Sequence, residues 1–480
     1  MNPVTVGFFL YLFLIMAIGI YTARQTRTLK DFALGGQRLG PWVIAFSERA
    51  SGESAWLILG LPGAALVAGL MELWTVVGCI SGIIFSWFFI ARRLRQATEE
   101  TGALTLPELF AKRFNDEKGI LRMLASLIIT FFFTFYVSAQ FAGAGKVLNV
   151  TFGISEMEGM LLGALIIIFY TLLGGFLAVA WTDLIQGIIM IGTLVILPLV
   201  AILEINSLDS IEFSMQPETL FGTKTGLAAL VTAIGGLSWG LGYMGQPHLV
   251  TRYMAIDQVK HVKISRRIAI AWAVPAFFGS MLIGMAGMFL LSAGTLSFEG
   301  QTLVGLAALD DPEKIMPILA QNLLHPWIAG IFISGAIAAM MSTADSQLLV
   351  STTVLTEDLL GNYWKGLKER IELLLVGRIL TVLIGIVAFL LAWRSESLVF
   401  EMVSYAWAGL GASFGPALLL TLWWKRVSKA GIIGGMLAGT LFTILDPFAQ
   451  WITVRFSAYL MAFLAVVLIS YLFPDPKKSI

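Results

Sequence analysis

The chain has 480 residues, of which 58% are hydrophobic and 13% are charged, and its formal net charge is +1. A soluble domain contains about 25% charged residues, so this composition excludes a soluble protein and predicts an integral membrane protein. Long apolar runs exclude a transmembrane β-barrel, the charge gives no reason to expect a nucleic-acid partner, and one cysteine, Cys79, excludes disulfides within the chain.

The apolar runs predict about thirteen membrane-spanning helices, because each crossing needs roughly 20 mostly apolar residues. The first run, Val4–Tyr21, has no basic segment before it and no small-residue cleavage site after it. We interpret it as a retained helix rather than a signal peptide. The expected spans centre near residues 5–22, 41–69, 72–91, 121–145, 158–178, 183–203, 226–250, 268–292, 327–354, 372–392, 398–423, 431–446 and 456–473.

Basic residues between the spans predict the orientation of the chain. If residue 1 faces outside, the outside segments contain only Lys146, Lys224, Lys314, Arg394 and Arg455. The inside segments contain the basic clusters in 24–38, 92–122, 252–267, 365–378, 425–429 and 477–478. This bias is what the positive-inside rule requires. We predict a multi-pass plasma-membrane protein with its N-terminus outside and its C-terminus in the cytoplasm.

Two spans contain residues that interrupt a continuous apolar helix. The second contains SERASGESAW, with Glu48, Arg49 and Glu53 near its middle, where charge is costly and indicates function. The seventh reads GGLSWGLGYMGQPH, and Pro247 marks its break. Interrupted spans at matching places in two halves point to the binding site of a transporter.

The two interrupted spans are five spans apart. An odd offset turns the second copy over in the membrane, so spans 2–6 and 7–11 would form inverted repeats. The chain is then one transmembrane transporter domain, 1–480. Its first repeat is 40–205, its inverted second repeat is 225–424, and 1–39 and 425–480 form peripheral helices.

The second and ninth spans offer oxygen ligands for Na⁺. Backbone carbonyls freed where a helix unwinds, here at Ala50 and Glu53, can replace the hydration shell of the ion. The ninth span, FISGAIAAMMSTADSQLLVSTT, adds the hydroxyls of Ser342, Thr343 and Ser346. A single hydroxyl in a span more often only bonds neighbouring helices together.

Two aspartates are further candidates for the handling of a cation. Asp345 lies among the hydroxyls of the ninth span, and a carboxylate inside a span is a functional candidate by default. Asp183 lies in GGFLAVAWTDLIQG at the inner end of the sixth span. From the sequence alone, Asp183 is equally well explained as a helix cap and as part of an ion relay.

The aromatic residues Trp56, Trp239 and Tyr243 lie beside the two breaks. Trp239 and Tyr243 are four residues apart and share a face if the backbone is helical there. Aromatic side chains beside glycine-opened backbone can line a small, partly apolar binding site, although core packing is the more frequent role of any one of them. No H-E-x-x-H or P-loop motif occurs, so neither a metalloprotease nor an ATP-driven pump is supported, and we expect no enzyme.

The stretches SAWLILGLPGA, GGFLAVAWTD, WGLGYMGQPH, MMSTADSQLLVSTTVLTEDL and VSYAWAGLGASFGP resemble the sodium/solute symporter family, in order and at family spacing. The resemblance covers nearly the whole chain. It implies an all-α integral membrane protein with the five-plus-five inverted-repeat fold of the leucine transporter, alternating access and Na⁺-driven uptake.

The resemblance also implies roles for individual residues. It implies that the substrate is lined by Trp56, Gly60, Trp239, Tyr243 and Pro247. It implies that Na⁺ is held by the backbone carbonyls of Ala50 and Glu53 and by the hydroxyls of Ser342 and Thr343. Asp183 matches an aspartate that contributes to a second Na⁺ site in some members.

The chain departs from the family around the proposed ion site. Proline-transporting members have an aspartate important for Na⁺ coupling where this chain has Gly52, and here the acid has moved to Glu53. Glu48 and Arg49 stand at positions that are usually small and uncharged. Asp345 stands where a small hydroxyl is usual.

Two explanations of these departures stay open. Glu48, Arg49 and Glu53 can form a structural salt-bridge group, because Arg49 and Glu53 are four residues apart and pairing reduces the cost of burial. Alternatively, Asp345, alone or with Asp183, replaces the missing aspartate as the counter-charge of the cation. A buried carboxylate can also carry a proton, which leaves H⁺ open as the coupling ion.

We therefore expect a symporter that imports a small zwitterion or carboxylate, proline first, with Na⁺ as coupling ion. We expect no other cofactor and no obligatory protein partner besides the lipid bilayer. The alternatives are H⁺ coupling, another organic solute, or a transporter-like ligand sensor, which the expected lack of an appended signalling domain disfavours. A channel is disfavoured by the two interrupted spans.

Overall fold

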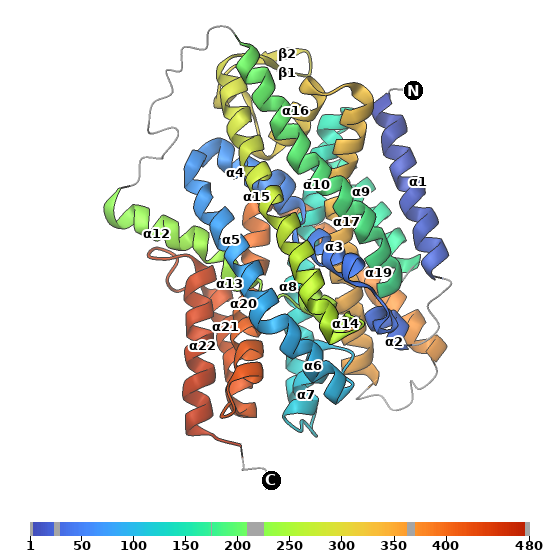
Figure 1. Ribbon diagram of the computed structural model, residues 1–480, viewed down its shortest axis with the longest axis vertical. Helices are drawn as coiled ribbons and strands as arrows, with labels where there is room; N and C mark the ends of the chain where they lie inside the picture. Colours follow the sequence, from blue (N-terminus) through green and yellow to red (C-terminus); the bar gives the residue numbers. More distant parts are fainter. Residues whose placement is uncertain (1–2, 24–28, 174, 209–224, 362–369, 476–480) are drawn as a thin grey trace.

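The protein is a bundle of long helices (Figure 1). The structure, a computed structural model, describes residues 3–23, 29–173, 175–208, 225–361 and 370–475. In Figure 1, α1 (Pro3–Ala23) begins at one end of the bundle and α22 (Val454–Leu472) ends at the other. Several basic residues used to predict the orientation lie outside the described residues: Arg24, Arg27, Lys224, Lys365, Lys368, Lys477 and Lys478.

Helices account for nearly all of the regular structure between α1 and α22. A two-stranded antiparallel hairpin, β1 (Leu296–Phe298) with β2 (Gln301–Leu303), lies at the end of the bundle where α1 begins. The remaining main elements are α2 (Leu29–Leu34), α3 (Pro41–Gly52), η2 (Trp56–Gly60), α4 (Leu61–Ala68), α5 (Leu73–Phe85), η4 (Ser86–Ile90), α6 (Ala91–Thr101), α7 (Leu106–Arg113), α8 (Ile120–Phe152), α9 (Glu156–Leu173), α10 (Phe176–Ser207), α12 (Gly226–Leu237), α13 (Trp239–Gly242), α14 (Pro247–Ala255), α15 (Val262–Ser292), η7 (Pro312–Lys314), α16 (Ile315–Leu323), α17 (Pro326–Thr353), η8 (Val354–Leu360), α19 (Arg370–Arg394), α20 (Val399–Trp423) and α21 (Lys429–Leu445).

The long helices have the length and surface of membrane-spanning segments. Among the described residues, nine helices are long and apolar enough to cross a membrane, or ten if one bent pair counts as a span. Large apolar side chains face outward, such as Phe13 at 74% and Leu203 at 68% exposure, as lipid contact requires. The predicted count of thirteen is not confirmed, because predicted crossings include short helices such as α3, with 12 residues, and α21, with 17.

The predicted break in the second span is present. α3 begins with Pro41 in its first turn and ends at Gly52, and the backbone of Glu53 leaves the helix at φ −106° and ψ 63°. The sequence Ser-Gly-Glu-Ser favours this end, because serine and glycine form helices poorly. Beyond the break, the side chain of Gln140 accepts a hydrogen bond from the Ala55 N–H at 3.0 Å. This bond replaces a partner that the interrupted helix does not provide.

The predicted break in the seventh span is also present. The segments Gly226–Gly242 and Pro247–Ala255 meet at an angle of 41°. Pro247 begins the second segment, where its missing N–H costs nothing. Glycine is required at Gly242, the last residue before the break, since a Cβ there would lie 1.8 Å from Trp407 Nε1. The two breaks come together because α3 packs against α14, and the Tyr243 hydroxyl at one break lies 3.1 Å from Glu53 Oε1 at the other. The boundaries of the two repeats stay a prediction.

The glycines of α5 and α13 let these two helices pack with their backbones in contact. A Cβ on Gly240 would lie 2.3 Å from the carbonyl oxygen of Gly78. We expect Gly240→Ala to lower the free energy of unfolding by about 1–3 kcal/mol, because the helices must separate. The matched control is Gly192→Ala in α10, where no heavy atom lies within 4 Å of the added Cβ. Thermal unfolding in detergent measures both, and equal midpoints for the two variants would contradict the expectation.

Candidate functional site

Five aromatic side chains from both broken spans and from α20 form one cluster. The rings of Trp56 and Trp239 stack at a centroid distance of 4.7 Å with an interplanar angle of 13°. Trp407 meets Tyr243 edge to face at 4.7 Å and donates from Nε1 to the Trp239 carbonyl at 2.9 Å. Phe400 packs on Trp239 at 5.1 Å. We call these five residues the aromatic cluster; its three tryptophans and Tyr243 are fully buried.

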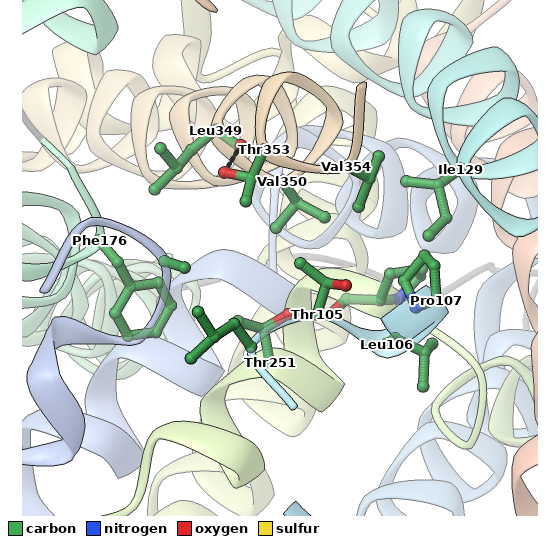
Figure 2. A pocket seen from close by; sticks show the side chains of 13 residues that line it. Thr105, Leu106, Pro107, Ile129, Phe176, Thr251, Leu349, Val350, Thr353 and Val354 are labelled. Atoms are coloured by element: carbon green, nitrogen blue, oxygen red, sulfur yellow. Dashed lines mark hydrogen bonds between the residues drawn. The ribbon is translucent and has the colours of Figure 1, made fainter. Parts of the chain in front are cut away.

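Gly60 adjoins the aromatic cluster, whereas Pro247 lies apart from it. A Cβ on Gly60 would lie 3.1 Å from the Phe400 Cβ, so any larger residue would press on that ring. Pro247 lines a separate cavity between α7, α8, α10, α14 and α17. Figure 2 shows Thr105, Phe176, Thr251 and Thr353 among the side chains around this cavity. The structure thus brings four of the five predicted substrate residues together, and a substrate role for Pro247 stays a prediction.

The three charged residues of the second span form one buried salt-bridge group: Glu48, Arg49 and Glu53. Arg49 donates from Nε to Glu48 Oε2 at 2.6 Å and from Nη2 to Glu48 Oε1. It also donates from Nη1 to Glu53 Oε1 at 2.6 Å, as expected from their spacing. All three side chains are fully buried. Their pairing reduces the cost of placing charge inside the membrane.

Three of the four predicted Na⁺ ligands, Ala50, Ser342 and Thr343, meet at the end of α3, whereas Thr343 faces the carbonyl of Ser51 rather than that of Glu53. The Ser342 hydroxyl lies 2.9 Å from the Ala50 carbonyl oxygen, and the Thr343 hydroxyl lies 3.0 Å from the Ser51 carbonyl oxygen. The backbone of Glu53 opens one turn later. Carbonyl and hydroxyl oxygens are the ligands with which opened transporter helices coordinate Na⁺. The arrangement can therefore hold a small monovalent cation between α3 and α17.

Asp183 lies inside α10 rather than at its end. α10 begins at Phe176, so the helix-cap explanation of Asp183 is wrong. Asp183 Oδ2 accepts hydrogen bonds from Ser47 at 2.6 Å and from Ser51 at 3.0 Å. It also pairs with Arg252 Nη2 at 3.1 Å, and both side chains are fully buried.

Asp345 has far fewer partners than Asp183. Its Oδ1 accepts a long bond of 3.4 Å from the Ser346 hydroxyl, which Arg252 Nη2 also contacts at 2.5 Å. Within the part of the chain that the structure describes, no hydrogen-bond partner reaches Asp345 Oδ2, Asp183 Oδ1 or Gln186 Oε1. We call Asp183, Asp345 and Arg252 the aspartate cluster. Unpartnered buried acceptors are costly, and a cation would satisfy them.

The sequence did not reveal several residues of these sites. Arg252 counted as one of the inside positive charges, although it is fully buried against Asp183. Trp407 lies in the stretch VSYAWAGLGASFGP, but nothing in that stretch tells which of its aromatic residues faces Trp239. Ser47 and Ser51 could have been suspected, because they flank the charges of the second span one helical turn apart.

Broken helices, an oxygen-lined break and a buried aromatic cluster define a membrane transporter for a small solute, not an enzyme. The model of the Sodium:solute symporter family matches residues 32–439, and the chain belongs to this family. It is 37% identical over 479 residues to the high-affinity proline transporter PutP of Bacillus subtilis (strain 168), covering 97% of each chain. It is also 37% identical to the sodium/proline symporter of Escherichia coli (strain K12), covering 94% of this chain and 89% of that one.

Solved structures confirm the predicted fold. The chain is similar to a Na⁺-coupled sialic acid symporter in a substrate-bound, outward-open state, with a TM-score of 0.78, 21% identity and complete coverage of both chains. It is also similar to Mhp1, a nucleobase-cation-symport-1 family transporter in a closed conformation. That TM-score is 0.55 at 12% identity, covering 95% of this chain and 98% of the other. The all-α, leucine-transporter-like fold expected from the sequence is therefore correct.

Proposed function

We propose that the protein is a secondary active symporter that imports a small amino acid, L-proline first, driven by a Na⁺ gradient. The names of the 37% identical relatives support the substrate and the ion. One observation carries the proposal: the break after α3 belongs to both candidate sites. Ala50 faces Ser342 just before the break, and Trp56 of the aromatic cluster follows it.

The shared break offers a physical basis for coupling. Trp56 Nε1 donates to the Gly52 carbonyl at 3.3 Å, so the first aromatic ring is bonded to the last turn of α3. A cation that orders the carbonyls of this turn also positions Trp56, and a solute that positions Trp56 orders the carbonyls. Such a coupling free energy is reciprocal. Alternating access of the two proposed repeats, 40–205 and 225–424, then opens both sites together to one side of the membrane and afterwards to the other.

The aspartate cluster is a candidate second cation site or counter-charge. Asp183 pairs with the guanidinium of Arg252, whereas Asp345 is connected to it only through the Ser346 hydroxyl, and each aspartate has an oxygen without a partner among the described residues. Na⁺ is the favoured cation. H⁺ is the second candidate, because within the described segments Asp345 accepts one long side-chain hydrogen bond, and a proton on Oδ2 would give it a donor.

We also propose that the protein lies in the plasma membrane. Its N-terminus would face outside and its C-terminus would face the cytoplasm. The end of the bundle at which α22 finishes also contains α6 and α7 (Figure 1). These two helices include Arg92, Arg93, Lys112 and Arg113. Such an accumulation of basic residues is typical of the cytoplasmic side.

Uptake of labelled proline into proteoliposomes tests the function. We expect accumulation under an inward Na⁺ gradient and none under H⁺ or Li⁺ gradients alone. Absence of uptake under every gradient would reject proline as the substrate, and uptake driven by H⁺ alone would reject Na⁺ as the ion. Saturable proline binding without transport would favour the ligand sensor instead.

A further inference from the structure

The salt-bridge group contains more negative than positive charge. It has two carboxylates, Glu48 and Glu53, and one guanidinium, Arg49. Glu48 is the better satisfied carboxylate: besides two bonds from Arg49, it accepts from Trp87 Nε1 at 3.2 Å and from the Tyr253 hydroxyl at 3.0 Å. Glu48 and Arg49 therefore form a closed, neutral pair.

Glu53 is the surplus carboxylate. It receives a single bond from Arg49, at Oε1, and within the part of the chain that the structure describes the one partner of Oε2 is the neutral hydroxyl of Tyr243, at 3.2 Å. The same hydroxyl lies 3.1 Å from Oε1. Glu53 is placed at the break after α3, and Tyr243 lies at the break between α13 and α14. The surplus charge thus lies where the two broken spans meet.

Tyr243 connects this charge directly to the aromatic cluster, since its ring lies against Trp407. The cluster also contains an unused donor. Trp239 Nε1 is buried and has no hydrogen-bond partner among the residues that the structure describes. A carboxylate attracts organic cations, and an indole N–H can donate to an anionic group. Together these groups match a small zwitterion.

We propose that the side chain of Glu53 binds the cationic nitrogen of the transported solute, with Trp239 Nε1–H donating to its anionic end. The inference rests on the proposed function, because it takes the aromatic cluster as the substrate site. It assigns Glu53 two separate tasks: the backbone carbonyl serves the Na⁺ site, and the carboxylate selects solutes with a positively charged nitrogen. Solutes of the same shape without that charge are rejected.

Competition against labelled proline uptake tests the role of the carboxylate. Unlabelled L-proline has the charged ring nitrogen, whereas tetrahydrofuran-2-carboxylate, with a ring of the same size, replaces it with oxygen. We compare the concentration of each compound that halves proline uptake, and we call the value for the oxygen analogue divided by that for the nitrogen compound the ratio. For the wild-type protein we expect a ratio of at least about ten, since a charged hydrogen bond is lost. In Glu53→Gln this ratio falls toward one. Because the backbone carbonyl is kept, the Na⁺ concentration for half-maximal uptake should change less than this ratio.

Glu48→Gln is the matched control, since it removes one carboxylate from the same group without touching Tyr243. Because Arg49 then has Glu53 as its one remaining carboxylate, we expect a ratio below that of the wild type but clearly above that of Glu53→Gln. A wild-type ratio near one, or a wild-type ratio in Glu53→Gln, overturns the proposal. If Glu53→Gln does not fold, Glu53→Asp, which retains the charge, replaces it and must keep a ratio clearly above one; a ratio of one in that variant also overturns the proposal.

A second measurement separates this inference from the choice of proline. Glycine betaine and 3,3-dimethylbutanoate have the same shape and differ in the charge of one central atom. If the protein transports no proline, binding can still be measured as a rise in the thermal unfolding midpoint. The midpoint is recorded with these two compounds and with the two ring compounds of the competition assay, and it shows whether the charged nitrogen is preferred. Stabilisation by the cationic member alone in the wild type and in Glu48→Gln, but not in Glu53→Gln, supports the proposal. The proposal is overturned if both members of a pair stabilise the wild-type protein equally. It is also overturned if none of the four compounds stabilises it.

Discussion

Arg49→Met is expected to destabilise the protein by about 3–5 kcal/mol, because it leaves two buried carboxylates without their cation. Glu48 would lose both guanidinium bonds, and the Tyr243 hydroxyl would be the one partner left to Glu53 among the residues that the structure describes. Methionine fills most of the volume, so the loss reports charge rather than a cavity. The measurement is the thermal unfolding midpoint of the purified protein in detergent, together with the amount that is recovered folded after expression.

A second variant separates charge from packing at the same place. In the triple variant Glu48→Gln, Arg49→Met, Glu53→Gln no charge is left to compensate. Because replacing a whole buried ion group is often nearly neutral, we expect most of the lost stability to return. A triple variant as unstable as Arg49→Met alone would show that the shape and hydrogen bonds of the arginine matter more than its charge.

Arg38→Met is the control for removing an arginine from an ion pair elsewhere. Arg38 pairs with Asp31; the side chain of Arg38 is 70% exposed, whereas that of Asp31 is 5% exposed. Because water reaches the guanidinium, its removal should cost less stability than the removal of a guanidinium that is buried with both of its carboxylates. A loss from Arg38→Met as large as that from Arg49→Met would contradict the argument that burial of the salt-bridge group sets the cost.

The sequence predicts the two breaks well because each depends on local chemistry. Ser-Gly-Glu-Ser ends α3 through poor helix propensity, and Pro247 begins α14 because it lacks an N–H. The pairing of Arg49 with Glu53 is also local, since helix geometry brings residues four apart together. The number of crossings does not follow from local chemistry in this way, because an apolar window does not show where one continuous helix becomes two short ones.

Contacts between distant segments could not be predicted in this way. Arg252 reaches Asp183 across 69 positions, and its charge alone placed it with the inside loops. Trp407 joins Trp239 across 168 positions because Gly242 leaves room for its indole. These partners depend on which helix faces lie together, which the packing of the whole bundle decides.

The largest expected effect on ion coupling comes from Asp345→Asn. The amide keeps the shape of the side chain and the acceptor that Ser346 contacts, and it removes the charge. If Asp345 is the counter-charge of the cation, the Na⁺ concentration for half-maximal uptake should rise at least about tenfold, the equivalent of 1.4 kcal/mol. Folding should be little affected, because Asp345 forms one long hydrogen bond and no ion pair among the described residues.

Asp183→Asn is the informative partner of that variant. Asp183 pairs with Arg252 and accepts bonds from Ser47 and Ser51, so its neutralisation leaves a buried guanidinium without its carboxylate. We expect its defect to be mainly a lower unfolding midpoint, of the size seen when a buried pair loses one member. The two substitutions in the aspartate cluster are thus expected to have different effects: Asp345→Asn lowers the affinity for the ion, and Asp183→Asn lowers the stability of the protein.

The comparison of driving gradients decides what Asp345 holds. Full Na⁺-driven uptake by Asp345→Asn would rule out the counter-charge. If the wild-type protein also responds to a proton gradient and the variant loses only that response, Asp345 carries H⁺ instead. The geometry favours Na⁺, because Ser51 belongs to both sites: its hydroxyl donates to Asp183, and its carbonyl accepts from Thr343. A charge removed from the aspartate cluster therefore acts on the same turn of α3 that offers its carbonyls to the ion.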